Sequence, residues 1–401
     1  MMNQAQTDAS KSFGAVLKDT ARNNVRQYTM IAALMAIWII FTALTNGLFI
    51  TSRNLSNLFI QTCTTGILTG GMLLVMVAGN IDLSVGSVCG TLGAVVAYLM
   101  TRAHIHPIFA ILITIACGFA IGAWHGFWVA YQGVPAFIVT LASQIAFRGF
   151  TLAVTNGATI GEFAPGFKSI GQGYLPRLFF HDAPYHDLTV ILCVIALIAF
   201  IASDIARRNK RIRNGFDVLP LSLEILKVSI ICAAIVGVGY VLSSYRGISY
   251  AILILLTVVA IFSIVTTRTP FGRHVYAIGG NREAAKLSGI NVKSTMMRIF
   301  LCMGTLSAVG SIVFTARLNA ATTSAGSMFE TDAIAACIIG GTSTSGGSGT
   351  VFGAIIGALV MASLDNGMSL MNLPIMIQYI IKGAILLLAV WVDITTKKKN
   401  G

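Results

Sequence analysis

The feature that most restricts the fold is a series of apolar runs, each about as long as a membrane is thick. A helix needs about 20 apolar residues to cross a bilayer. Eleven such runs lie near residues 28–49, 55–78, 84–101, 107–131, 135–155, 187–204, 221–244, 247–266, 295–316, 350–366 and 374–392. Hydrophobic residues make up 56% of the chain and charged residues only 10%, which excludes a soluble protein. We therefore expect an all-α, polytopic membrane protein with about 10–12 transmembrane helices.

One further apolar segment, Thr331 to Gly341, is too short to cross a membrane unaided, and a run rich in Gly, Ser and Thr follows it. We expect a half-helix that leads into irregular backbone, which is tolerated at membrane depth only inside protein or beside a watery cavity. Residues 79–87 and 340–348 share Gly, Ser, Gly and Ser at matching offsets, and each segment follows an apolar run. Repeated broken helices of this kind form the central site of many transporters.

Basic residues are concentrated in four blocks. They are Lys11, Lys18, Arg22 and Arg26; Arg207, Arg208, Lys210, Arg211 and Arg213; Arg268, Arg273, Arg282, Lys286, Lys293 and Arg298; and Lys397, Lys398 and Lys399. The positive-inside rule places all four blocks, and so both termini, in the cytoplasm. The net charge of +13 therefore reflects membrane topology, and no nucleic-acid partner is expected.

This charge pattern predicts a layout around one transmembrane domain, residues 28–392, which contacts the lipid bilayer. The expected parts outside the membrane are a cytoplasmic tail over 1–27, a periplasmic loop over 156–186, a cytoplasmic basic loop over 205–220, a cytoplasmic loop over 267–294 and a basic tail over 393–401.

The loop from Gly279 to Val292 is polar and carries a helix signal. Asn281 can cap a helix, Arg282 to Leu287 are mostly good helix formers, and Gly289 can end it in the left-handed conformation. A helix of about two turns is marginal in water, so this one needs a surface to dock on. From the loop alone, a simple connector between two spans is an equally good interpretation.

The sequence lacks the motifs of several chemistries. It contains no Gly-x-x-x-x-Gly-Lys-[Ser/Thr] phosphate loop, no His-Glu-x-x-His and no Thr-Val-Gly-Tyr-Gly filter. Ser345 has no histidine in a later apolar span to act as its base, so a catalytic role is not expected. The seven cysteines lie in apolar runs and are interpreted as packing residues, and no metal site or cofactor is expected.

Ionisable and amide groups within spans are costly, so they indicate a functional path. The candidates for a translocation pathway are Asn80, Asp82, Ser84, Glu330, Asp332 and Asn366. For Asp82 and Asp332, pairing with other buried groups is an equally good interpretation. Arg148 and Lys382 also lie in apolar context, where we expect them to extend their charged ends towards the interface.

Several long motifs, in order along the chain, resemble the permease subunits of bacterial ABC importers for monosaccharides, the ribose, xylose and galactose group. They are Asn80 to Ser87, Val134 to Leu141, Phe147 to Gly149, Thr155 to Gly157, Tyr276 to Asn281, Leu287 to Val292, Ala316 to Leu318, Glu330 to Ala336, Ile339 to Ser343, and Asp365 to Gly367. The resemblance covers most of the chain except the tails and about 160–250. That region is longer than in ribose-type permeases and resembles the xylose or multiple-sugar type.

The resemblance implies a fold like that of the ribose and vitamin-B12 importers, in a multi-pass protein of the bacterial inner membrane. It implies a homodimeric pore, a periplasmic sugar-binding protein and a separate cytoplasmic ATPase, which would bind the ATP. The family's coupling loop, which lies in a groove of the ATPase, corresponds here to Asn281, Arg282, Glu283, Ala284, Ala285, Leu287, Ser288 and Gly289.

Two other classes of function stay open at this point. A stand-alone, ion-coupled secondary transporter would use Asp82 or Asp332 as its cation site. An intramembrane enzyme would depend on Ser345, and the missing base disfavours it.

Overall fold

The computed structural model describes residues 25–179, 183–216, 218 and 220–400, and most of them are helical. The long apolar helices are α2 (Val25–Leu44), α3 (Ser52–Val77), α4 (Val85–Thr101), α5 (Pro107–Gly126), α6 (Ala136–Thr155), α8 (Asp187–Arg213), α9 (Leu221–Ser243), α10 (Tyr250–Arg268), α13 (Val292–Leu318), α15 (Val351–Leu370) and α16 (Ile375–Asn400). In this part of the chain nine helices are long and apolar enough to cross a membrane, and α2 and α4 are shorter apolar helices. Each corresponds to an expected run, so the polytopic all-α fold is confirmed.

Shorter elements connect these helices. They are η2, a π-helical turn at Phe127–Tyr131, α7 (Pro165–Gln172), α11 (Pro270–Gly280), α12 (Arg282–Leu287), α14 (Phe329–Ile339), and the two-residue strands β1 (Ile160–Gly161) and β2 (Ala320–Ala321). The strands pair antiparallel. The expected half-helix is confirmed as α14, which begins two residues earlier than Thr331. Glu330 and Asp332 lie in its first turn, where acidic side chains stabilise the helix dipole.

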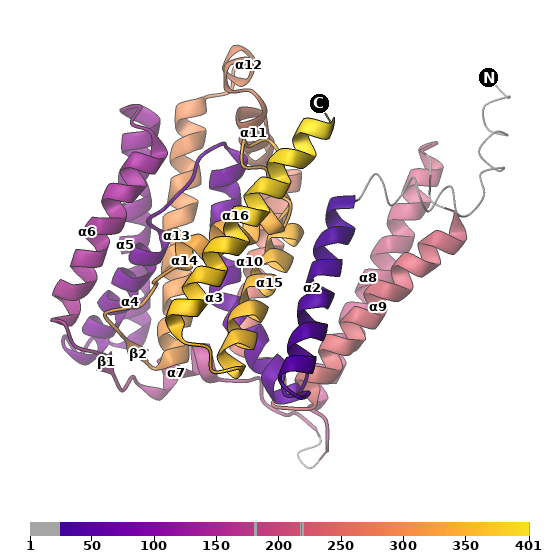
Figure 1. Cartoon of the computed structure of the whole chain (residues 1–401), viewed down its shortest axis with the longest axis horizontal. Coiled ribbons are helices and arrows are strands. Elements are labelled where there is room, and N and C mark those ends of the chain that lie inside the picture. Colours follow the sequence, from indigo (N-terminus) through magenta and orange to yellow (C-terminus); the bar gives the residue numbers. More distant parts are fainter. Residues whose placement is uncertain (1–24, 180–182, 217, 219, 401) are drawn as a thin grey trace. The chain divides into compact units, whose positions relative to one another are not determined.

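The half-helix α14 reverses the direction of the chain between α13 and α15. The helix α13 starts beside α12 and runs away from it, and the segment after α13 with α14 then brings the chain back (Figure 1). Consequently α15 again starts at the α12 end, where the carbonyl oxygen of Gly349 accepts a hydrogen bond from Tyr276 of α11. The end of α16 lies at this same end of the larger unit (Figure 1).

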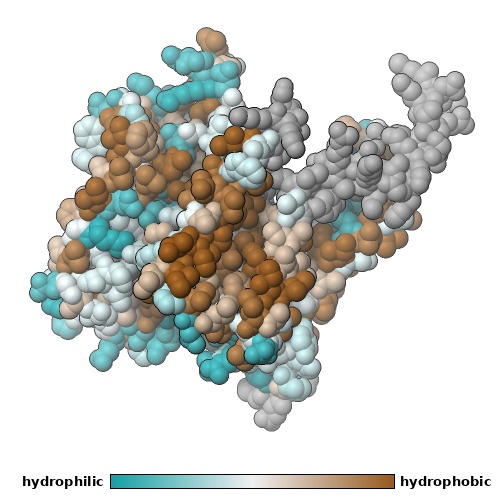
Figure 2. Space-filling model, viewed as in Figure 1, coloured by the Kyte–Doolittle hydropathy of each residue, from teal (hydrophilic) through white to brown (hydrophobic). Residues whose placement is uncertain are grey.

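The chain divides into two compact units. The larger unit comprises 30–173 and 249–401, and its centre is formed by α3, α13 and α15, which are mostly buried. Glycines allow close helix contacts there, since a Cβ on Gly118 of α5 would lie only 2.5 Å from the carbonyl oxygen of Gly304 of α13. Hydrophobic side chains gather over α16 on the face that Figure 2 shows, and hydrophilic ones surround α12. An apolar outer face of this kind suits contact with lipid.

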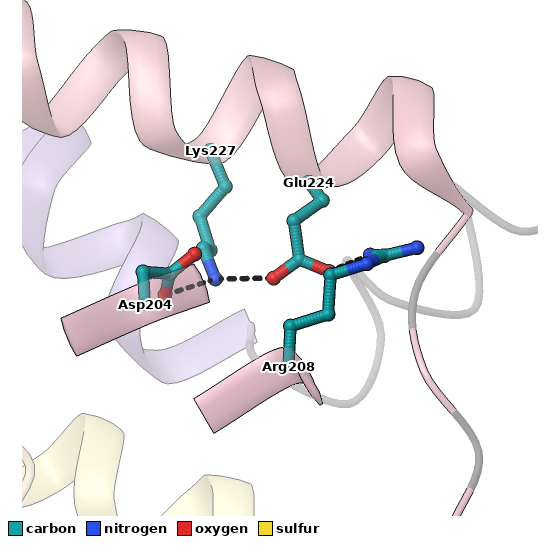
Figure 3. A network of polar contacts seen from close by, with 4 residues as sticks. All are labelled: Asp204, Arg208, Glu224 and Lys227. Carbon is teal, nitrogen blue, oxygen red and sulfur yellow. Dashed lines mark hydrogen bonds and ion pairs between the residues drawn. The ribbon is translucent and has the colours of Figure 1, made fainter. Parts of the chain in front are cut away.

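The smaller unit includes residues 174–248 and contains the antiparallel pair α8 and α9. Four charged side chains join these helices in one network (Figure 3). Lys227 Nζ lies 2.9 Å from Asp204 and 3.0 Å from Glu224, whose other carboxylate oxygen pairs with Arg208. The apolar run predicted to end at residue 204 therefore continues as helix to Arg213. Cross-helix pairs and basic residues in the last turn both stabilise that extension.

Several segments expected as loops or tails contain regular structure. The expected basic loop over 205–220 begins with the last two turns of α8, the loop over 267–294 holds α11 and α12, and the tail over 393–401 continues α16 to Asn400. The loop over 156–186 contains β1 and α7. Residues 1–24, which hold most of the first basic block, lie outside the described residues.

Candidate functional site

The loop between α10 and α13 contains the helix that the sequence predicts. Asn281 Oδ1 accepts a hydrogen bond from the backbone N–H of Ala284 at 2.9 Å and so caps α12. At the other end Gly289 has a φ of +83°, and the N–H of Ile290 donates to the carbonyl oxygen of Ala285 at 3.1 Å. With the bond from the Gly289 N–H to Lys286, this forms a Schellman motif. Both ends of the helix are therefore closed by local hydrogen bonds.

Nearly all of α12 projects from the protein. Within its six residues only Ala285 is buried, whereas the side chain of Leu287 is 88% exposed. Glu283 lies in the first turn and Lys286 in the last, which matches the helix dipole at each end. An exposed leucine among charged residues is typical of a surface that a partner protein covers.

The preceding helix, α11, connects α12 to the body of the protein. Asn281 ends α11 and also caps α12, so no linker separates the two helices. Tyr276 Oη donates to the carbonyl oxygen of Gly349 at 2.7 Å. Burial raises the pKa of Tyr276, so its hydroxyl stays protonated and keeps this bond over the physiological range.

Asp82 and Ser84 lie together at the start of α4. Asp82 is 2% exposed, and its Oδ1 accepts from the N–H of Ser84 at 2.8 Å and from Ser84 Oγ at 2.6 Å. The carboxylate thus stabilises the positive end of a helix that begins inside the protein. Its hydrogen bonds are local, which explains how it is tolerated in an apolar setting.

Glu330, at the start of α14, lies against the first turn of α4. A Cβ on Gly86 would be only 2.1 Å from Glu330 Oε2, so glycine is what lets the carboxylate approach. Gln144 of α6 donates to Glu330 Oε1 at 3.1 Å. Oε2 is buried and has no hydrogen-bond partner among the described residues. Glu330 of α14 and Gln144 of α6 thus lie against the start of α4, where Asp82 and Ser84 are, and the four side chains form one buried polar centre.

Arg148 of α6 belongs to the same centre. Its guanidinium donates to the carbonyl oxygen of Ala325 and to Ser327 Oγ, both at 3.1 Å. It therefore holds the segment that precedes α14, and the expectation that it extends to the interface is wrong. Free carbonyl and hydroxyl groups in that irregular segment attract the guanidinium more strongly than distant water does.

Asp332 lies on another side of α14 and belongs to a separate ionic cluster. Lys382 Nζ of α16 lies 3.0 Å from Asp332 and 2.9 Å from Asp365 of α15. Lys382 is only 7% exposed, so the expectation that it reaches the interface is also wrong. An ammonium at this depth is stabilised by nearby carboxylates. The cluster joins α16 to α14 and α15.

The two amide candidates bond to partners outside the polar centre. Asn366 exchanges hydrogen bonds with Asn54 of α3, at 2.8 Å and 3.1 Å. Asn80 donates to the carbonyl oxygen of Ala78 at 3.1 Å. The six pathway candidates thus occupy four places. Among the described residues, no group of three His, Cys, Asp or Glu side chains is placed to hold a metal ion.

Sequence reasoning did not assign a role to Gln144 and missed the partners of Arg148 and Lys382. Gln144 and Arg148 are four residues apart on an otherwise apolar run, which places them on one face of a helix. That spacing was the available signal. A lysine within an apolar span can likewise pair with a carboxylate from another segment, and Asp332 and Asp365 were the candidates for such a pair.

The structure has the features of a membrane transport protein built from broken helices. Two helices begin inside the protein, irregular backbone is buried beside them, and a polar loop protrudes from the larger unit. Comparison with known proteins narrows this class. Residues 54–390 match the family model described as "Branched-chain amino acid transport system / permease component". The chain belongs to this permease family.

Curated relatives match along nearly the whole chain. The chain is 45% identical over 376 residues to the xylose transport system permease protein XylH of Haemophilus influenzae, covering 94% of this chain and 98% of the relative. It is 44% identical to XylH of Escherichia coli, with 94% of both covered. The ribose import permease protein RbsC of Bacillus subtilis is 31% identical, with 89% of both covered. These relatives confirm the resemblance seen in the motifs. No solved structure matches the chain significantly.

Proposed function

We propose that this chain is the membrane permease subunit of an ATP-driven sugar importer that moves xylose, or a set of related monosaccharides, into the cytoplasm. The observation that carries the proposal is α12, a preformed helix with an exposed leucine, in a chain whose sequence has no phosphate loop of its own. Energy would therefore come from another chain. The identity of 45% with a xylose permease supports the substrate class.

The implied partners are a cytoplasmic ATPase, a periplasmic sugar-binding protein and a second copy of this chain. The ATPase would bind α12 and its flanks from Asn281 to Gly289, with ATP on the ATPase and no catalytic group on the permease. We assign the α12 end of the larger unit to the cytoplasm of a bacterial inner membrane, because most of the basic residues of 267–294 lie there. The end of α16 shares that side, and β1 and α7 would be periplasmic.

Within the proposed pathway the strongest candidates are Asp82, Ser84 and Glu330. Glu330 Oε2 is a buried acceptor without a hydrogen-bond partner among the described residues, and we propose that a sugar hydroxyl donates to it. Asp332 and Asn366 already have partners in Lys382 and Asn54. We infer that these two, with Asn80, maintain the shape of the path rather than contact the sugar.

The ion-coupled secondary transporter is disfavoured by the position of Lys382. Its ammonium lies within 3.0 Å of Asp332 and Asp365, where a coupling cation would have to bind. Asp82 is a poor alternative, because its Oδ1 accepts two hydrogen bonds at a helix start that favours anions.

Reconstitution in liposomes distinguishes the two functions. With the cognate ATPase and binding protein, we expect xylose uptake that requires ATP and continues without an ion gradient. The permease alone should show no uptake when a proton or sodium gradient is imposed. Gradient-driven uptake by the permease alone would overturn the proposal, and uptake of a different sugar by the complete complex would correct only the substrate.

A further inference from the structure

Three segments that are far apart in the sequence meet at the C-terminal end of α11, with no side chains between them. The N–H of Gly347, from the loop between α14 and α15, donates to the carbonyl oxygen of Val77 at the end of α3, at 2.9 Å. A Cβ on Gly279 of α11 would lie 1.7 Å from that same oxygen and 2.6 Å from the Gly347 nitrogen. We call Val77, Gly279, Gly346 and Gly347 the glycine junction.

The backbone at the junction depends on glycine in more than one segment. Gly346 and Gly347 have φ values of +86° and +76°, which side chains rarely adopt. A Cβ on Gly346 would lie 3.0 Å from both Val77 O and Gly279 O. The neighbouring Gly280 differs, because a Cβ there would meet nothing within 4 Å. The backbone of Gly280 also borders the junction, since its Cα would lie 3.1 Å from a Cβ on Gly347, but a side chain at position 280 would point away from it.

Tyr276 forms a second connection between the same two segments. It lies three residues before Gly279, one turn earlier on α11, and its hydroxyl donates to the carbonyl oxygen of Gly349 at 2.7 Å. Helix α11 is therefore attached to the loop between α14 and α15 at two points, one by a hydrogen bond and one by direct backbone contact.

Each segment of the junction leads directly to a functional element. Helix α11 passes into α12 through Asn281 alone. The end of α3 leads within seven residues to Ser84, the cap of α4, and the loop with Gly347 follows α14, which carries Glu330. Backbone packed on backbone has no rotamers with which to absorb a displacement. A rigid contact of this kind would carry a shift of α12 to the helices that hold the polar centre.

We propose that the glycine junction positions α4 and α14 in response to α12, and so couples the ATPase contact to the translocation pathway. Gly279 is the positioning residue that makes this connection. The inference rests on the proposed function, and it adds a defined internal route that binding of the ATPase alone does not require.

The test compares two neighbouring substitutions, Gly279→Ala and Gly280→Ala, in the complete reconstituted complex. Both exchange glycine for alanine in the last turn of α11, so any change in helix propensity is matched. The readout is the ratio of xylose imported to ATP hydrolysed, together with co-purification of the ATPase. We expect Gly279→Ala to retain the ATPase but to lower the ratio about tenfold, a typical strength of coupling between two sites. Gly280→Ala should behave as the wild type.

Equal ratios for the two variants would overturn the inference. Should Gly279→Ala fail to accumulate in the membrane, Tyr276→Phe decides, because it removes one hydrogen bond and leaves the ring in place. A lowered import ratio in Tyr276→Phe supports the inference, and a wild-type ratio overturns it. If the wild-type complex itself shows no ATP-driven import, that result contradicts the proposed function. It does so without any comparison of the variants.

Discussion

Replacing Leu287 by alanine tests whether α12 is a docking surface. Leu287 is 88% exposed on a helix whose two ends are closed by local hydrogen bonds. Alanine is a better helix former than leucine, so the substitution leaves α12 intact and removes only apolar side-chain surface. Any loss of ATPase binding would then come from the contact itself.

The size of the effect follows from the surface removed. Leucine has three more carbon atoms than alanine, and each buried methylene contributes about 0.8 kcal/mol. With 88% of the side chain available for burial, the loss is about 2 kcal/mol if the partner covers it fully. Since about 1.4 kcal/mol corresponds to a factor of ten, the dissociation constant should rise about 30-fold.

The assay is equilibrium binding of the cognate ATPase to the permease in lipid nanodiscs. Leu287→Met retains an apolar side chain of similar volume and should stay near the wild type. Lys286→Ala removes an exposed charge on the same helix, for which a change of about 0–1 kcal/mol is usual. A dissociation constant for Leu287→Ala within twofold of the wild type would refute the idea that Leu287 is covered by the ATPase.

Two further substitutions test other parts of the structure. Gly289→Pro should abolish ATP-driven uptake, because proline fixes φ near −65° where the glycine has +83° and also removes the N–H that bonds to Lys286. In the control variant Gly289→Ala the new methyl group meets no neighbour. This variant should lose only about 1–2 kcal/mol to left-handed backbone strain and keep measurable uptake. Lys382→Met should destabilise the protein by about 3–5 kcal/mol in thermal unfolding, because it leaves Asp332 and Asp365 without their counter-ion. Adding Asp332→Asn and Asp365→Asn should recover much of that loss, and an unchanged melting temperature in Lys382→Met would contradict the ionic cluster.

The sequence predicted those features that depend on neighbours along the chain. The apolar runs located the long helices because a membrane span is defined by length and composition. Asn281 and Gly289 located the two ends of α12 because caps act within a few residues. The short run before the Gly- and Ser-rich segment likewise located α14, only two residues from its start.

Features that depend on contacts between distant segments could not be predicted in the same way. Whether Lys382 reaches water or a carboxylate depends on how α16 packs against α14 and α15, and the sequence leaves both outcomes open. Asp82 and Asp332 looked alike as buried acids, yet one bonds within its own turn and the other pairs with a lysine. The meeting of Val77, Gly279 and Gly347 also depends on three separate segments, and glycine content alone did not indicate it.

The direct passage from α11 into α12 has a consequence for how tightly a partner can bind. A docking segment on a loose linker must be ordered at each encounter, which costs conformational entropy of about 1–2 kcal/mol for every residue fixed. Because Asn281 serves both helices and each end of α12 is closed by hydrogen bonds, this ordering is complete when the permease folds. The free energy that the proposed contact of Leu287 supplies then remains available for affinity, and a transporter that works in repeated cycles need not re-form α12 in each one.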